Sequence, residues 1–154
     1  MTFTQTAKHA LIGFGIGIAA LMTTGQALAQ SMVSVKGSTV NMRTKPTTAS
    51  EVMWELKRGY PLKVVQRKGR WLQVVDFEGD RGWVARSLTG STPHFVVKSK
   101  TANMRSGPGT NNRIVGKAQY GDLMRTLAKR SGWAQVQGAD GKKGWISQKL
   151  LWGF

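Results

Sequence analysis

The sequence has no cysteine, only seven acidic residues against 23 lysines and arginines, and two histidines among its 154 residues. The absence of cysteine excludes disulfide bonds, a lipid-modified cysteine and cysteine–histidine peptidase chemistry. The few carboxylates leave little for glycoside hydrolysis, which needs two of them held across one sugar bond. We therefore expect a protein that is not an enzyme and that uses neither a cofactor nor a metal ion.

Long apolar runs are also absent. The longest, residues 10–22, is shorter than the ~20 residues of a membrane-spanning helix and contains several glycines. It follows Lys8 and precedes the triplet Ala27-Leu28-Ala29, a pattern typical of a secretory signal. The sequence predicts a signal peptide at residues 1–29, cleavage after Ala29, and an exported protein, periplasmic or secreted, with no transmembrane anchor in the mature chain. Retention of this segment as an uncleaved anchor is the alternative.

The shortage of acidic residues gives the predicted mature chain 22 basic and seven acidic side chains, a net charge of +15. A charge of this size concentrates polyanions at a protein surface. For an exported protein these are cell-wall carboxylates, lipopolysaccharide phosphates and extracellular DNA. A solubilising surface without a dedicated partner is the other interpretation.

A repeat organises the rest of the chain. Residues 39–47 read Thr-Val-Asn-Met-Arg-Thr-Lys-Pro-Thr, and residues 101–109 read Thr-Ala-Asn-Met-Arg-Ser-Gly-Pro-Gly. The same offset of 62 positions relates Trp71 to Trp133 and Trp83 to Trp145, with no gap. A register held over this length indicates a tandem duplication. We predict one domain at residues 30–90 and a second at residues 91–154.

Each repeat has the pattern of short strands separated by turns. In the first repeat, β-rich stretches lie at residues 33–35, 39–42, 52–56, 62–67, 71–75 and 81–85, divided by turns that are mostly rich in glycine. No helical periodicity is present. The pattern predicts an all-β fold, with two tandem small antiparallel barrels after the signal peptide. Residues 89–95 are expected to form a linker that exposes His94.

Four tryptophans are candidate ligand-binding residues. Strand alternation places Leu72 and Val74 on one face and Trp71 on the other, and the second repeat follows the same pattern. If the valine face is the core, the rings lie on the outer or rim side. They then form an aromatic shelf for a ligand, or they close barrels that lack other large side chains. The candidates are Trp71, Trp83, Trp133 and Trp145.

Arg43 and Arg105 are the other binding candidates, at equivalent positions of the two repeats. A guanidinium there can grip a ligand carboxylate with two hydrogen bonds. It can also bond the carbonyls of the neighbouring loop and fix that loop, which is the role we favour. Asn41 and Asn103 are expected to satisfy backbone groups of the turn.

A cluster of acidic residues lies at one hairpin tip of the first repeat, at Asp76, Glu78 and Asp80. Aspartate is favoured beside turn glycines because it bonds the local backbone. No second cluster supplies the further oxygen ligands of a hard-cation site. We interpret these residues as turn chemistry.

One family shares these features together. The stretch Asn-Met-Arg-Ser-Gly-Pro-Gly, a later Gly-Trp, and a closing Gly-Trp-Ile or Gly-Trp-Val before a Leu resemble the bacterial SH3-like (SH3b) domain. The resemblance covers residues 34–88 and 96–150, and it implies barrels that bind rather than catalyse. Such domains often direct cell-wall hydrolases to peptidoglycan.

The favoured function is therefore noncatalytic binding of the cell envelope, with a peptidoglycan peptide or glycan as ligand. An envelope protein is the other partner, which would make the chain a periplasmic protein interaction adaptor. A nonspecific polyanion binder is a further alternative, although nucleic acid is not the favoured partner.

Overall fold

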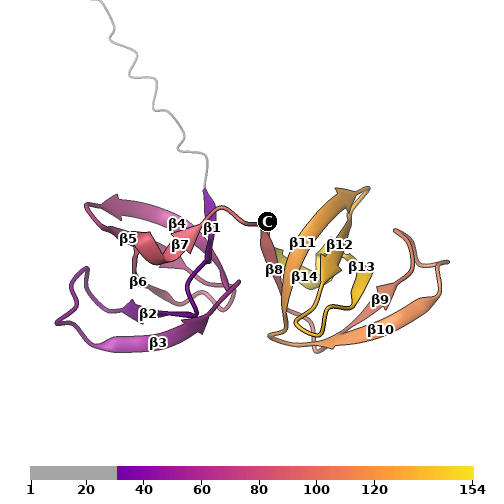
Figure 1. The fold of residues 1–154 in the computed structure, drawn as a ribbon, viewed down its shortest axis with the longest axis horizontal. Coiled ribbons are helices and arrows are strands. Elements are labelled where there is room, and N and C mark those ends of the chain that lie inside the picture. The colour runs from indigo at the N-terminus through magenta and orange to yellow at the C-terminus, as the bar shows by residue number, and fades with distance from the viewer. Residues whose placement is uncertain (1–30) are drawn as a thin grey trace, which may run out of the picture.

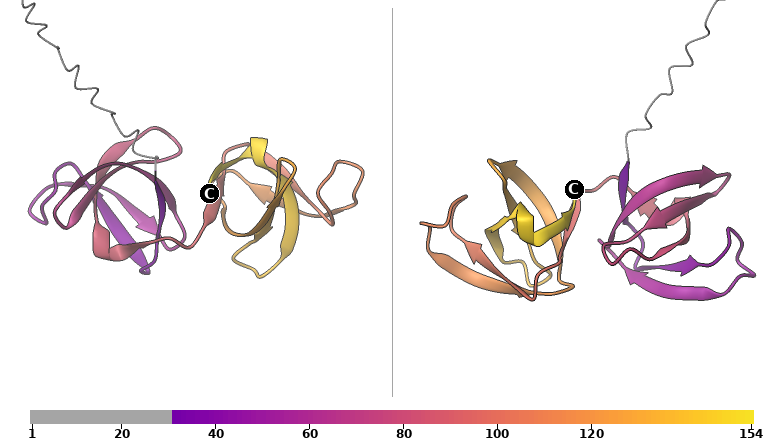
Figure 2. Two further views of the ribbon diagram at one scale, coloured as in Figure 1. Left: turned by 90° about the horizontal axis from the view of Figure 1, so that it is seen from above. Right: turned by 180° about the vertical axis from the view of Figure 1, so that it is seen from behind.

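The computed structural model describes residues 31–154 of the chain. The predicted signal peptide at residues 1–29 and its cleavage after Ala29 lie outside the described residues. The described chain is all-β, with two antiparallel sheets of seven strands each (Figure 1). Each sheet curls into a small barrel, and the two barrels lie side by side (Figure 2). The predicted fold class is confirmed.

The strands of the first barrel have the spatial order β3-β2-β6-β5-β4-β1-β7. The second barrel repeats this topology as β10-β9-β13-β12-β11-β8-β14. A short 3-10 turn precedes the last strand of each barrel, η1 at Arg86–Leu88 and η2 at Gln148–Leu150. The strands of the first barrel are β1 Met32–Val35, β2 Thr39–Arg43, β3 Val52–Lys57, β4 Pro61–Lys68, β5 Trp71–Val75, β6 Arg81–Ala85 and β7 Thr89–Gly90. Those of the second are β8 His94–Val97, β9 Thr101–Arg105, β10 Ile114–Gln119, β11 Leu123–Arg130, β12 Trp133–Gln137, β13 Lys143–Ser147 and β14 Leu151–Gly153.

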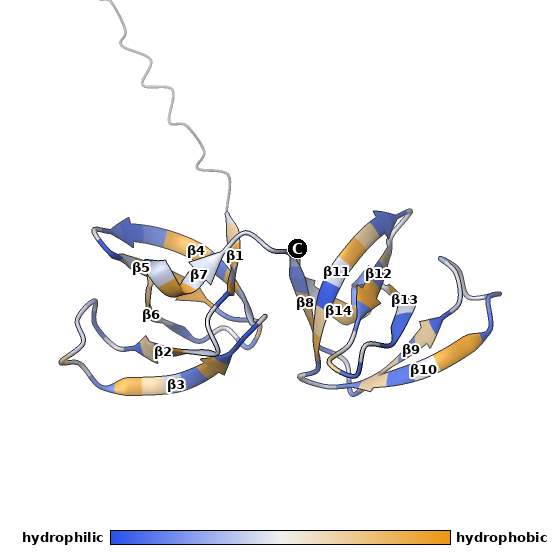
Figure 3. Cartoon of the chain, in the orientation of Figure 1, coloured by the Kyte–Doolittle hydropathy of each residue, from blue (hydrophilic) through white to orange (hydrophobic). Residues whose placement is uncertain are grey.

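Strand alternation separates the core from the outer face as predicted. On β5, Leu72 and Val74 are 1% and 0% exposed, whereas their neighbours on the strand are half-buried. On β12, Ala134 and Val136 are both fully buried in the same way. Each barrel therefore has its own hydrophobic core. Apolar residues lie along the strands, whereas the tips of β4 and β11 are hydrophilic (Figure 3).

Bulges interrupt this alternation at equivalent places in the two barrels. The register shifts once between β2 and β3 and once between β4 and β5, and again between β9 and β10 and between β11 and β12. A bulge adds one residue and bends the strand. Val65, Val115 and Leu127 lie at such shifts and are 37%, 40% and 38% exposed. The bulges thus let long strands turn the corner of a small barrel, and apolar side chains point outward there.

The two hairpins at the ends of β4 and β11 turn differently. In the second barrel both turn residues have positive φ, 48° at Ser131 and 80° at Gly132. In the first barrel Gly69 alone has positive φ, 56°, and Arg70 does not. These are the patterns of type I′ and type II′ turns, respectively. Moving the glycine by one position therefore changes the turn type and keeps the hairpin.

The linker predicted at residues 89–95 is shorter in the structure, and the prediction that it exposes His94 was wrong. Thr89–Gly90 forms β7 and pairs with β1, and His94 begins β8. Only residues 91–93 connect the barrels. His94 is half-buried because its ring packs against Gly59 of the first barrel, where an added Cβ would lie 2.8 Å from Cδ2 of His94. Its Nδ1 donates to the Thr92 carbonyl at 3.0 Å.

Candidate functional site

The arginines at the ends of β2 and β9 hold the loops that follow them. Arg43 Nη1 donates to the Ser50 carbonyl at 2.7 Å. Arg105 Nη1 donates to two carbonyls, those of Thr110 at 2.8 Å and Asn112 at 2.9 Å. The loop-fixing role favoured from the sequence is thus observed in both barrels. In each arginine a single nitrogen, Nη1, makes these bonds, so the other guanidinium nitrogens can still contact a ligand.

The two loops have different shapes for a local reason. In the second barrel an added Cβ at Gly107 would lie 2.8 Å from Oδ1 of Asn112, so a larger residue there would force the Asn112 side chain to move. The first barrel has Lys45 in that position, and Ser50 Oγ donates to the Lys45 carbonyl at 2.9 Å. The two loops therefore differ in shape although their arginines match.

The candidate tryptophans lie on the outer faces of the sheets. Cross-strand pairs join Gln135 to Trp145 and Trp145 to Arg105, so these three side chains share one face. Trp133 lies on the same face two residues before Gln135. The first barrel repeats the arrangement, with Trp83 opposite Arg43. Trp83 is only 9% exposed, whereas Trp71, Trp133 and Trp145 are half-buried.

A groove of about 230 Å³ brings part of this set together in the second barrel. Arg105 and Trp133 both line it, and Trp145 does not. Asn103 also lines the groove, and the backbone role expected for its side chain stays a prediction. The lining residues are Thr101, Asn103, Arg105, Thr110, Trp133, Ser147 and Leu150.

The acidic hairpin tip is organised by the backbone. Oδ1 of Asp76 accepts hydrogen bonds from the backbone nitrogens of Glu78 at 3.0 Å and Asp80 at 2.8 Å. Burial raises the pKa of Asp76, and these two hydrogen bonds oppose the shift. Carboxylate oxygens of the three acids lie within 4.8 Å of one another, the one such cluster in the described part of the chain. The turn interpretation accounts for the bonds of Asp76.

Four aromatic residues around this tip were not singled out from the sequence. Trp54 Nε1 donates to Oδ2 of Asp80 at 2.9 Å. The Phe77 ring lies 6.1 Å from Tyr60 and 5.4 Å from Tyr120, which belongs to the second barrel. Burial and the nearby carboxylates raise the pKa of Tyr60. The available signal was that these residues break the repeat, since the second copy has Gly116, Asp122 and Ala139 where the first has Trp54, Tyr60 and Phe77.

Comparison with known proteins identifies the class of this fold. A bacterial SH3 domain model matches residues 36–90, and a second bacterial SH3 domain model matches residues 100–151. The chain therefore belongs to the bacterial SH3 domain family and carries two such domains in tandem. Across residues 31–154, no helix has the length and apolar character to cross a membrane.

Two curated relatives share parts of the chain. A putative N-acetylmuramoyl-L-alanine amidase of Bacillus subtilis, YrvJ, is 26% identical over 80% of this chain and 26% of its own length. A probable cell wall amidase of Staphylococcus epidermidis, LytH, is 38% identical over 47% of this chain and 28% of its own length. This chain thus spans about a quarter of the length of these relatives.

Solved structures also match this chain, at lower sequence identity. NlpC1 from Trichomonas vaginalis matches with a TM-score of 0.37 and 14% identity, over 79% of this chain and 45% of that one. An NlpC/P60 family protein from Bacillus cereus matches with a TM-score of 0.38 and 15% identity, over 80% of this chain and 56% of that one.

Proposed function

We propose that this protein is an exported, noncatalytic binding protein of the cell wall, with a peptidoglycan peptide or glycan as its ligand. The observation that carries the proposal is the groove of the second barrel, where Arg105, Asn103 and Trp133 converge. A half-buried indole offers an apolar face to a sugar or peptide. The guanidinium beside it can pair with a wall carboxylate.

The comparisons support the same ligand class. The relatives are named as a putative N-acetylmuramoyl-L-alanine amidase and a probable cell wall amidase, and this chain consists largely of two tandem SH3 domains. Two weak modules joined in one chain gain avidity on a polymer that repeats the same unit. This arrangement suits a wall better than a small soluble ligand.

The charge of the molecule favours a second candidate function, the capture of polyanions. Among residues 31–154 a single ion pair is recorded, Lys142 with Asp140 at 3.7 Å, so most basic side chains have no carboxylate within reach. The hydrophilic tips of β4 and β11 end in Arg67-Lys68 and Lys129-Arg130. Binding of this kind weakens steeply as salt rises.

Sedimentation with purified insoluble peptidoglycan separates the two candidates. The full-length protein is incubated with the wall at low salt and at physiological salt, where exposed charges are screened beyond about 8 Å. Wall binding through the groove predicts retention at both salt concentrations and loss of retention in Trp133→Ala. Trp71→Ala, at the equivalent position of the first barrel, is the matched control and is expected to retain more.

The folded state of both variants is checked by their amide spectra. Retention that disappears at physiological salt would favour polyanion capture. Retention that is equal in the wild type and in a folded Trp133→Ala variant would contradict the groove as the site.

A further inference from the structure

The end of each barrel beside its last hairpin is closed differently. In the first barrel three rings gather there, from Trp54, Tyr60 and Phe77. Trp54 is held in place by its hydrogen bond to Asp80, and the Tyr60 hydroxyl donates to Oδ2 of Asp76 at 3.4 Å. Aromatic side chains thus cover this end of the first barrel.

The second barrel has the same backbone topology without these rings. At the offset of 62 positions, Gly116, Asp122 and Ala139 replace the three aromatic residues, and Lys142 replaces Asp80. A hollow of about 260 Å³ lies there. It is lined by Met104, Gly116, Lys117, Asp122, Leu123, Met124, Gly138, Ala139, Asp140 and Lys142. Since a water occupies about 30 Å³ in the liquid, the hollow has room for a short peptide.

The lining combines an apolar floor with charges of both signs. Met104 and Met124 are each 4% exposed and form the floor. Two carboxylates and two ammonium groups surround the opening. A purely anionic ligand would meet the two carboxylates, and a purely cationic ligand would meet the two lysines, so the charges match a ligand that carries both signs.

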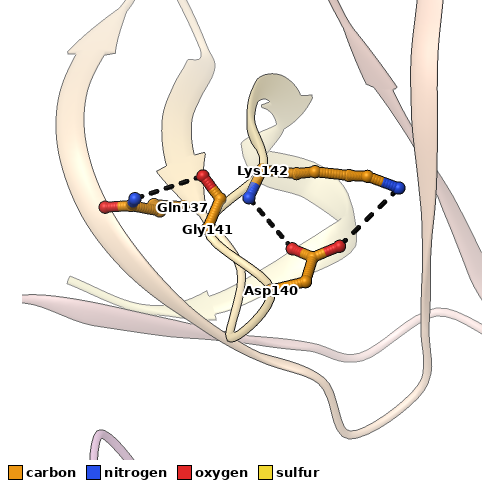
Figure 4. A network of polar contacts seen from close by, with 4 residues as sticks. All are labelled: Gln137, Asp140, Gly141 and Lys142. Atoms are coloured by element: carbon orange, nitrogen blue, oxygen red, sulfur yellow. Dashed lines mark hydrogen bonds and ion pairs between the residues drawn. The ribbon is translucent and has the colours of Figure 1, made fainter.

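Backbone hydrogen bonds hold the carboxylates in position. Oδ1 of Asp140 accepts from the backbone nitrogen of Lys142 at 3.0 Å, and Gln137 Nε2 donates to the Gly141 carbonyl at 3.2 Å (Figure 4). Oδ2 of Asp122 accepts from the backbone nitrogen of Gln119 at 2.8 Å. The acids are therefore fixed by turns. Lys142 pairs with Asp140 at 3.7 Å, and because both side chains are exposed this ion pair is weak and a ligand with both charges can replace it.

We propose that this hollow binds the end of a short zwitterionic peptide. Asp122 and Asp140 receive its ammonium group, Lys117 and Lys142 receive its carboxylate, and the methionine floor packs against its apolar atoms. The site shares no lining residue with the groove of Arg105 and Trp133. Met104 lies on the face of β9 opposite to the face that carries its neighbours Asn103 and Arg105. The inference therefore goes beyond the proposed function. Only the idea that the cell wall supplies the peptide rests on that function.

Triglycine is the probe, and the methionine ε-methyl groups of the full-length protein are the reporters in NMR titrations. Saturable shifts are expected at Met104 and Met124 and not at Met42, which is the counterpart of Met104 in the filled barrel. Acetylation of the amino end or amidation of the carboxyl end should each weaken binding roughly two- to fivefold, the range for an exposed ion pair. Absence of shifts at Met104 and Met124, or equal affinity for the capped peptides, would overturn the proposal.

Matched variants test the hollow itself. The double variant Gly116→Trp with Lys142→Asp reproduces the residue pair that forms the Trp54–Asp80 hydrogen bond of the first barrel. An added Cβ at Gly116 would lie 3.7 Å from Met104 Sδ, which is an ordinary contact. This variant should lose the triglycine shifts. The exchange in the first barrel, Trp54→Gly with Asp80→Lys, should leave them unchanged. Shifts that persist in the filled variant would refute the site.

A second pair of substitutions tests the site even if the variant Gly116→Trp with Lys142→Asp does not fold. Asp122→Asn with Asp140→Asn preserves the oxygen acceptors of both turns and removes the charges, so the affinity for triglycine should fall while the amide spectrum stays native. An unchanged affinity would overturn the proposed charge recognition. Trp133→Ala should not alter triglycine binding, so failure of wall binding and failure of this site can be told apart. Peptides released from purified peptidoglycan then show whether the wall supplies the ligand.

Discussion

Single residues in this protein act through the backbone around them. The sequence identified Arg43 and Arg105 as a pair, and left loop fixing and ligand binding open as their roles. The structure shows the first role for one nitrogen of each side chain. The sequence could not show that Arg105 spans two carbonyls and Arg43 one, because this depends on loop shapes set by Gly107 and Ser50.

Asp76 provides a pH-dependent prediction at this scale. Its pKa in the folded protein is raised above the ordinary value of 3.8, chiefly by burial. The folded state therefore binds a proton more readily than the unfolded state, and stability from this group is present at low pH and is lost as pH rises through the raised pKa. Relative to Asp76→Asn, the wild-type first barrel should become less stable between about pH 3 and pH 6.

Amide hydrogen exchange of the first barrel measures this difference across the pH range. Asparagine keeps an oxygen that accepts the backbone bonds of the turn, so the turn itself is retained. The second barrel, which has Gly138 at the equivalent position, is the internal control and should show no difference between the two proteins. A wild type that gains stability relative to Asp76→Asn as the pH rises would contradict the sign of the shift.

The strands were the most predictable elements. The limits of β5 and β6 follow from alternation and turn glycines, and the structure has them at the predicted residues. The structure extends β4 at both ends to Pro61–Lys68. The bulges could not be predicted, because the extra residue lies inside an apolar run and only the partner strand shows the shift. The two-residue strand β7 was missed because pairing with β1 defines it, and no local pattern does.

The glycine before each closing tryptophan determines how closely two strands approach. An added Cβ at Gly82 would lie 2.7 Å from Met42 Cγ and 3.0 Å from the Arg43 carbonyl. Overpacking of this kind costs about 1–3 kcal/mol. Gly82→Ala should therefore lower the stability of the first barrel by this amount, measured as a shift of its thermal transition in calorimetry.

Gly144→Ala is the matched substitution in the second barrel. Its added Cβ would lie 3.0 Å from Met104 Cβ and 3.4 Å from the Arg105 carbonyl, so the clash is smaller. We expect the cost to lie at the lower end of the same range. A larger effect at Gly144 than at Gly82 would show that the strands yield more easily in the first barrel than these distances indicate.

At the scale of the whole molecule, the two barrels touch through residues that the repeat does not share. The Tyr120 ring packs against the Phe77 ring at an angle of 55°, and the Tyr120 hydroxyl donates to Glu78. That hydrogen bond raises the pKa of Tyr120. At the offset of the repeat, Tyr120 corresponds to Arg58 and Phe77 to Ala139. The orientation of the barrels could not be predicted, because it rests on side chains present in one copy only.

Removal of this contact should uncouple the barrels. Tyr120→Ala deletes the ring, and an aromatic pair is worth about 0.5–1.5 kcal/mol beyond its buried area. We expect the two barrels then to tumble more independently, which amide nitrogen relaxation detects as a shorter rotational correlation time. Tyr120→Phe keeps the ring and removes the hydroxyl, so it should behave more like the wild type. An unchanged correlation time in Tyr120→Ala would mean that the contacts around His94 suffice.

The pairing of the first and last strands of each barrel has a mechanical consequence. β1 and β7 are antiparallel neighbours joined at two residue pairs, Ser34 with Gly90 and Val35 with Thr89. The chain enters and leaves this barrel at the same end of that ladder. A pulling force along the chain would therefore load these hydrogen bonds one after another, as in unzipping, and would not shear them together. Under tension applied at its two ends, the first barrel would open at low force, one residue pair at a time, and lengthen the chain.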